Sequence, residues 1–140
     1  MSEWILWAIL SAFFAALTAI LAKLGLDGVD PDYATLLRTV VILGVLAAFV
    51  AVLGKWRSPI DLPGRAGLFL VLSALATGAS WVCFFRALKL GEAAMVNTVD
   101  KLSVVLTALL AVTLLGERPT PRAWAGIGFV TLGVVLVIRK

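Results

Sequence analysis

The chain has 140 residues, of which 62% are hydrophobic and 14% are charged, and its formal net charge is +4. Soluble domains are about 45–50% apolar and about 25% charged, and a chain of this length cannot hide such an excess of apolar surface in one core. The composition therefore excludes a soluble domain and predicts an integral membrane protein.

Several other classes of protein are excluded by counting residues. The chain has no histidine, which excludes Ser–His and Cys–His catalysis and His-ligated metals. The basic residues stand singly at the ends of apolar runs, so we expect no nucleic-acid partner. The single cysteine, Cys83, cannot form an intrachain disulfide. Residues 1–20 lack a basic leader and a cleavage site, and they are interpreted as a retained span.

Five apolar segments are long enough, or nearly so, to cross a hydrocarbon core about 30 Å thick, which takes roughly 20 helical residues. None of them alternates polar and apolar residues, so helices are favoured over barrel strands. The sequence predicts an all-α integral membrane protein with five transmembrane helices, over residues 4–22, 33–54, 66–88, 93–115 and 123–138. The 140 residues then form a single five-helix domain.

The connections between these spans carry residues typical of turns and caps. Asp30 is the expected N-cap of the second span, with Pro31 at its first position. Thr120 is the expected cap of the last span, which Pro121 and Arg122 immediately precede. The dipeptide Leu90-Gly91 predicts a tight hairpin between the third and fourth spans.

The basic residues near the ends of the spans and in the connections are evenly divided between the two sides of the membrane. Five lie on the N-terminal side, namely Lys55, Arg57, Arg65, Arg118 and Arg122. Five lie on the other side, namely Lys23, Arg86, Lys89, Arg139 and Lys140. The positive-inside rule needs an excess on one side, so we expect weak topology or copies that insert both ways round. Lys23 and Lys89 are expected to act only as interface anchors.

Two adjacent charges, Asp100 and Lys101, interrupt the fourth span. Asp100 lies about 10 Å into the helix at 1.5 Å per residue, and a charge at such depth costs at least about 2.5 kcal/mol. Both residues are therefore candidates for binding substrate or an ion, and an interhelical ion pair that only fixes packing is the alternative. Because successive helical residues do not face one another, we expect each to have a partner on another helix. Arg38 and Arg86 can reach Asp100 if the spans pack together.

Small polar residues recur at helical spacing on two spans and mark candidate lining of a ligand cavity. On the fourth span they are Asn97 and Thr107, on either side of Asp100. On the third span they are Ser73, Thr77 and Ser80, with Trp81 beside them. An aromatic wall next to hydroxyl groups suits an organic ligand, and Arg38 could bind an anionic group or extend to the interface as an anchor. Polar residues that only join helices are the alternative explanation.

Two glycines are expected to form a helix-packing face on the last span. Gly126 and Gly133 are seven residues apart, close to two helical turns, so they lie on one face. Small residues allow close helix approach in lipid, either within one copy or across a dimer.

The second half of the chain also carries a specific order of features. These are Phe84–Leu88 at the end of a span, Glu92–Ala94 opening the next, Leu115-Gly116-Glu117 at its end, Pro119-Thr120, and the spacing of Gly126 and Gly133-Val134. This order resembles the EamA domain of the drug/metabolite transporter superfamily, in which a Leu-Gly-Glu turn links the last two spans. Lys23 and Arg38 also fit the pattern of that domain.

The resemblance implies one half of an inverted-repeat transporter, since most members join two such domains in one chain. The expected function is to move a small organic molecule, with proton coupling as an option, by alternating access in a homodimer, which we expect to be antiparallel. Two features of relatives are absent: a proline after Ser103 in the fourth span, and the first-span carboxylate of the small multidrug resistance branch. The proton mechanism of that branch is therefore not carried over.

Two other functions remain open from the sequence. The alternative is a non-transporting accessory or lipid-binding subunit, in a heteromer with a second half-size chain. An intramembrane enzyme is disfavoured, because the acids of the loop at Asp27, Asp30 and Asp32 are explained by solvation and helix capping. We expect no cofactor and no metal. The expected location is the plasma (inner) membrane of a bacterium or archaeon, as a multi-pass protein.

Overall fold

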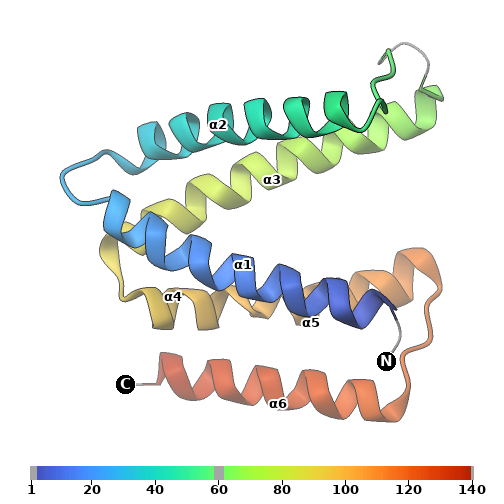
Figure 1. The fold of residues 1–140 in the computed structure, drawn as a ribbon. Helices are drawn as coiled ribbons and strands as arrows, with labels where there is room; N and C mark the ends of the chain where they lie inside the picture. Colours follow the sequence, from blue (N-terminus) through green and yellow to red (C-terminus); the bar gives the residue numbers. More distant parts are fainter. Residues whose placement is uncertain (1–2, 59–61, 140) are drawn as a thin grey trace. The chain divides into compact units, whose positions relative to one another are not determined.

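The computed structural model describes residues 3–58 and 62–139, and these are almost entirely helical, without strands (Figure 1). Five helical segments of this part of the chain are long and apolar enough to span a membrane. They are α1 (Glu3–Gly25), α2 (Pro31–Val52), α3 (Gly64–Leu90), the run Ala93–Leu115, and α6 (Pro121–Ile138). The predicted all-α membrane fold is confirmed. Lys140, one of the basic residues counted above, lies outside the described residues.

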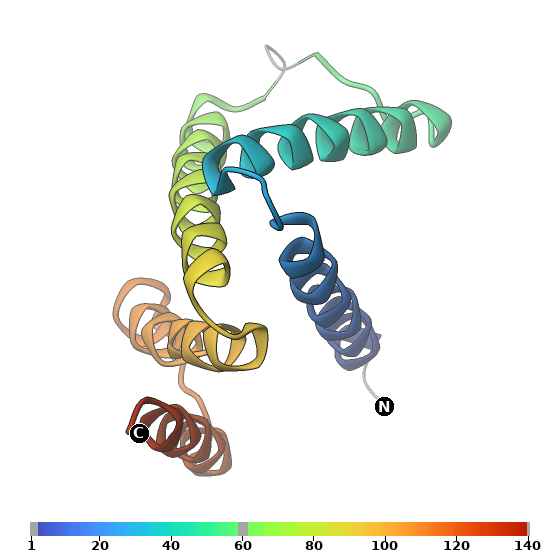
Figure 2. The same cartoon turned by 90° about the vertical axis from the view of Figure 1, so that its left-hand side faces the viewer.

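The chain divides into two compact units, each described by itself. The first, here called the hairpin unit, is Ile20–Leu90, and the second, the terminal unit, is Met1–Ala19 with Gly91–Lys140. In the hairpin unit α2 and α3 run in opposite directions and contact one another (Figure 1). They lie together where α2 begins and α3 ends, and they diverge toward their other ends (Figure 2).

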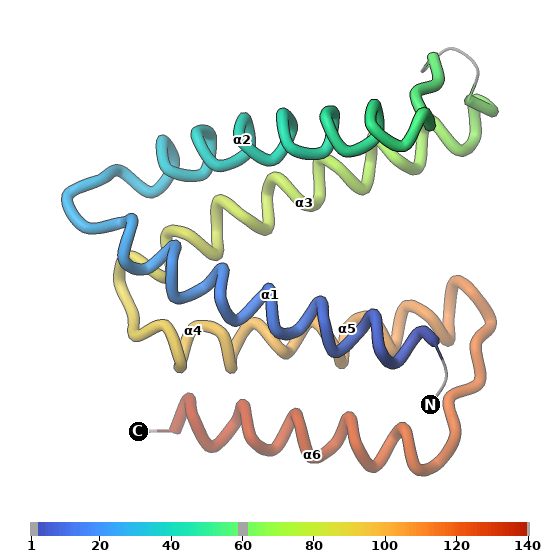
Figure 3. The backbone as a smooth tube through the Cα atoms, in the orientation of Figure 1, coloured from blue at the N-terminus to red at the C-terminus, as the bar shows by residue number. Residues whose placement is uncertain are grey.

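The fourth span, in the terminal unit, is divided into three pieces. It consists of α4 (Ala93–Asp100), α5 (Leu102–Leu110) and a π-helical end, η2 (Ala111–Leu115). At the first interruption the N–H of Lys101 donates to the carbonyl of Thr98 at 3.1 Å, and the N–H of Val104 donates to the carbonyl of Lys101 at 3.0 Å. These i to i−3 bonds form a tighter turn than an α-helix. The pieces still follow one another along one line (Figure 3), and α6 packs against α4 and α5.

Both predicted N-caps are confirmed. The Asp30 side chain accepts hydrogen bonds from the N–H groups of Asp32 and Tyr33, each at 3.0 Å. The Thr120 hydroxyl accepts from the N–H of Ala123 at 3.3 Å. Such bonds satisfy N–H groups that have no partner inside the helix, and the proline in the first turn of each helix has no N–H to satisfy.

Very few side chains are buried within one copy of the chain. Among the described residues they are Ala19, Leu26, Thr35, Phe85, Leu88 and Val134. Large apolar side chains are exposed along all five spans. Lipid, or another protein chain, must therefore cover most of the apolar surface.

Candidate functional site

A pocket of about 370 Å³ lies between α2 and α3 in the hairpin unit. From α2 it is lined by Thr35 and Thr39, which are one helical turn apart. From α3 it is lined by a longer stripe: Leu70, Ser73, Ala74, Thr77, Gly78 and Trp81. The antiparallel hairpin thereby sets two pairs of hydroxyl groups beside an indole ring. The combination of a flat apolar wall and a few polar groups is typical of a site for a small organic molecule.

The threonine hydroxyls of this pocket already donate their protons to the helix backbone. Thr35 donates to the carbonyl of Pro31 at 2.8 Å, and Thr39 donates to that of Thr35 at 2.7 Å. On α3, Thr77 donates to the carbonyl of Ser73 at 2.9 Å. A hydroxyl has one donor and two acceptor lone pairs, so these three groups offer a ligand only acceptors.

Arg38 lies against aromatic rings of α3 at the end of this pocket. Its guanidinium carbon is 4.6 Å from the ring centroid of Trp81, which lines the pocket, and 5.4 Å from that of Phe85. Both distances are within the range of cation–π attraction. Arg38 is seven residues from the start of α2, about 10 Å along the helix axis. The hairpin therefore holds a half-buried cation at a depth where charge is costly.

The structure brings together four of the residues singled out in the sequence, which are Arg38, Ser73, Thr77 and Trp81. It does not bring in Ser80, which is exposed and does not line the pocket. The sequence analysis missed Thr35 and Thr39. The sequence signal for them is that Thr35 and Thr39 are four residues apart with Arg38 between them. All three therefore lie on one face of α2.

Asp100 and Lys101, in the terminal unit, form an ion pair with 3.7 Å between the Lys101 Nζ and an Asp100 carboxylate oxygen. The expectation that these two neighbours would be poorly placed to neutralise one another was wrong, while a partner for either of them on another helix stays a prediction. It assumed a continuous helix, whereas the tight turn at Lys101 changes the direction of successive side chains. The two side chains stay 41% and 45% exposed, so the pair is still open to a ligand or to lipid. Asn97 lies on α4, before this turn, and Thr107 on α5, after it.

Arg86 was expected to reach toward Asp100, but it binds Asp32 instead. Its Nε and Nη2 donate to the two carboxylate oxygens of Asp32 at 2.8 and 2.7 Å, which is a bidentate pair. The reason is the hairpin itself, because Asp32 is in the first turn of α2 and α3 ends beside it (Figure 1). Whether Arg38 reaches Asp100 stays a prediction, since the two residues belong to different units.

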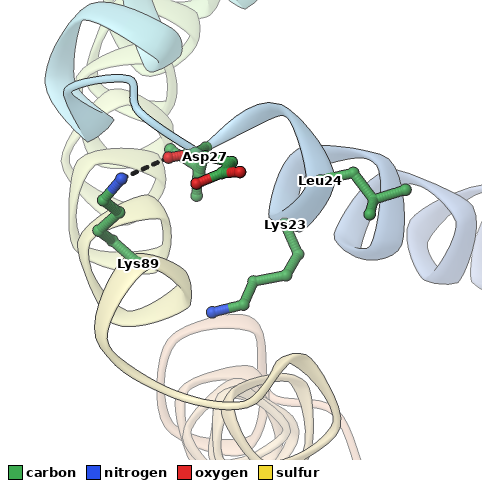
Figure 4. A pocket seen from close by; sticks show the side chains of 5 residues that line it. Lys23, Leu24, Asp27 and Lys89 are labelled. Atoms are coloured by element: carbon green, nitrogen blue, oxygen red, sulfur yellow. Dashed lines mark hydrogen bonds between the residues drawn. The ribbon is translucent and has the colours of Figure 1, made fainter.

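Lys23 and Lys89 do more than anchor helices at the interface. The Lys23 ammonium donates to the carbonyl of Leu88 at 2.6 Å, and the Lys89 ammonium donates to the carbonyl of Leu26. Each lysine thus bonds a carbonyl at the end of the other's helix, within the hairpin unit. A second pocket, of about 480 Å³, lies among Lys23, Leu24, Leu26, Asp27 and Lys89 (Figure 4). Basic residues in the last turn of a helix give a sequence signal for such carbonyl contacts.

Comparison with known proteins relates the chain to one protein family. The chain matches the EamA-like transporter family over residues 2–139, which includes every helix described above. It is similar to a protein of Sinorhizobium sp. named "Uncharacterized transporter in cobO 3'region", with 54% identity over 135 residues, or 96% of each chain. No solved structure matches the chain. The resemblance to the EamA domain found in the sequence is confirmed.

Proposed function

We propose, from the premise that this chain belongs to the EamA-like transporter family, that it is one half of a transporter that moves a small organic molecule across the membrane. The observation that carries the proposal is the pocket between α2 and α3, inside the spans, with hydroxyl groups on both helices and Trp81 as a wall. We place the protein in the plasma (inner) membrane of a bacterium or archaeon.

Two copies of the chain would form the complete transporter. The described residues of one copy supply five spans and bury very few side chains, so most of the helix surface is left for a partner or for lipid. An antiparallel arrangement supplies the inverted half that alternating access uses, and the balanced basic residues are compatible with insertion in both orientations. In this dimer Asp100, Lys101, Asn97 and Thr107 line part of the route, and Asp100 is the carboxylate that contacts the substrate or responds to the coupling ion.

A transport assay with an unbiased set of compounds tests this proposal. Proteoliposomes are loaded with a mixture of amino acids, organic acids and organic cations, and efflux is followed by mass spectrometry. The Trp81→Leu variant should lower the flux of whichever compound is transported by at least about tenfold, because the half-buried indole ring contributes that much to binding when a ligand packs against it. Trp56→Leu is the matched control, since Trp56 follows α2 and lies outside the pocket.

Equal flux in the Trp81→Leu and native proteins contradicts the assignment of the pocket. Absence of efflux for every compound, from a correctly inserted protein, contradicts transport by this chain alone. That second result favours the accessory subunit of a heteromer.

The two glycines of α6 give a test of the proposed dimer. A Cβ added at Gly126 or at Gly133 meets no atom of a neighbouring helix within 4 Å, so these glycines make no close helix contact within the described part of the terminal unit. Of the two expected roles of this glycine face, the one left is a contact between two copies. We therefore expect the double variant Gly126→Leu with Gly133→Leu to reduce dimerisation strongly, because leucine holds two helices apart. The measurement is size-exclusion chromatography with light scattering in mild detergent.

Gly128 supplies the control for this experiment. It is equally open in one copy, and it lies two residues from Gly126, on another face of α6. Gly128→Leu should leave the dimer intact. If the double variant dimerises as well as Gly128→Leu does, the glycine face does not form the interface.

A further inference from the structure

Arg38 is the starting point, because its charge has no partner of opposite sign in the described part of the hairpin unit. Two acids of this unit are already occupied there, since Asp30 caps α2 and Asp32 binds Arg86. Asp27 lines the pocket of Lys23 and Lys89. The contacts of Arg38 are the rings of Trp81 and Phe85. Rings attract a cation but supply no oxygen acceptor for its five N–H donors.

The position of this guanidinium relates it directly to the pocket. Arg38 lies between Thr35 and Thr39 on α2, and both threonines line the pocket. It also contacts Trp81, which is the last residue along α3 to line the pocket. A carboxylate at the Trp81 end of the pocket is therefore within reach of the guanidinium. The planar fork of an arginine matches the two oxygens of a carboxylate, and such pairs are strong where water is excluded.

The remainder of the pocket defines the other part of the ligand. Its three threonine hydroxyls offer acceptors only, because their protons are bonded to the backbone. A group that carries an O–H or N–H donor satisfies them. The flat face of Trp81 suits a planar body, and the apolar Leu70, Ala74 and Gly78, together with Ser73, complete the lining.

We infer that the ligand of the α2–α3 pocket is a small organic carboxylate whose planar body carries a hydrogen-bond donor. Arg38 binds the carboxylate, Trp81 stacks against the body, and the threonines accept from the donor. This inference rests on the proposed function, since it names the substrate class of the same site. It also accounts for the cation at this depth, because a bound anion neutralises a charge that is otherwise costly within the membrane.

Three probes that share one hydroxyphenyl ring and are anionic, neutral and cationic test this substrate class. They are 4-hydroxybenzoate, the neutral 4-hydroxybenzamide and the cationic 4-hydroxybenzylamine, titrated by calorimetry into the full chain in nanodiscs of phosphatidylcholine. The carboxylate should bind at least about tenfold more tightly than the amide, and the amine should bind weakest of the three. Arg38→Gln should weaken the carboxylate by about tenfold to a hundredfold and remove the preference among the three probes.

A matched control is available in the same hairpin. Arg65, at the start of α3, also lies over a ring, with 6.0 Å between its guanidinium carbon and the centroid of Phe69, but it is outside the pocket. Arg65→Gln removes the same charge and should leave carboxylate binding unchanged. Arg38→Lys keeps the charge without the planar fork, so it should retain only part of the affinity and confirms that the site tolerates substitution.

Preference for the amine or the amide, or binding by none of the three probes, overturns the inference. So does an equal loss of binding in Arg38→Gln and Arg65→Gln. An anionic lipid offers the same negative charge, so the titration is repeated with phosphatidylglycerol in the nanodisc. If that lipid displaces 4-hydroxybenzoate from the native protein and not from Arg38→Gln, the occupant is a lipid headgroup and the small carboxylate is overturned.

The outcome is separable from that of the proposed function. Efflux of an organic cation that depends on Trp81 would uphold transport and contradict the carboxylate. Arg38-dependent binding of 4-hydroxybenzoate without any efflux would uphold the ligand class and contradict transport by this chain alone.

Discussion

Replacing Asp100 by Asn is expected to abolish transport while the protein still inserts and assembles. The substitution preserves the size of the side chain and removes its charge and its ability to exchange a proton. It also leaves Lys101 without the carboxylate to which it is now paired at 3.7 Å. An ionisable group at this depth costs about 2.5–3.5 kcal/mol, a cost more consistent with a functional role than with packing alone. Flux in proteoliposomes, compared at equal amounts of inserted protein, is the measurement.

A charge exchange separates function from packing at this position. In the double variant Asp100→Lys with Lys101→Asp the ion pair can form again, but the carboxylate is moved by one residue. A pair that serves only to hold the turn between α4 and α5 should recover activity in this variant, whereas a carboxylate required at position 100 should not. Asp27→Asn, in the loop before α2, is the control for loss of one acidic group. Full activity of Asp100→Asn would contradict the assignment.

Adding three lysines after the C-terminus is expected to drive all copies into one orientation and to eliminate activity. The basic residues number five on each side, so a small excess decides the orientation under the positive-inside rule. An antiparallel dimer cannot form from copies that all insert the same way. Activity should return when this variant is expressed together with one that carries three added lysines in the 116–120 connection, on the opposite side.

Three serines added at the same place serve as the control, because they extend the chain without changing its charge. The orientation itself is measured by labelling a single cysteine at the C-terminus from each side of the membrane, in a background with Cys83 replaced by Ser. Labelling of the native protein from one side only would exclude the antiparallel homodimer. A parallel dimer, or an inverted partner encoded elsewhere, would then replace it.

Most of the helical architecture follows from the sequence by simple physical rules. An apolar run of about 20 residues has to satisfy its backbone groups within itself when it enters lipid, which leaves a helix as the solution. The caps at Asp30 and Thr120 follow because only a few side chains can accept from the free N–H groups of a first turn. These are local properties, and the sequence states them directly.

The contacts between helices follow from the sequence much less well. Which residue of α3 lies opposite Asp32 depends on how far one helix is displaced along the other, and helical periodicity carries no information about that displacement. Arg86 was therefore associated with the wrong acid. The break at Lys101 was missed for a related reason, since an apolar run of 23 residues shows no signal for a single tighter turn. Thr35 and Thr39 are ordinary helix residues until α3 is placed beside them.

The scarcity of buried side chains in one copy has a consequence for the life of the protein in the cell. If the proposed dimer is the working unit, a newly inserted copy, which buries few of its described side chains, has to meet a second chain before quality-control proteases meet it. A copy without a partner leaves the half-exposed Asp100 and Lys101 facing lipid. If assembly needs both orientations, the scarcer orientation determines how many complexes form. Copies of the more abundant orientation that find no partner are then degraded. The numbers of copies in the two orientations become equal without any regulation of synthesis.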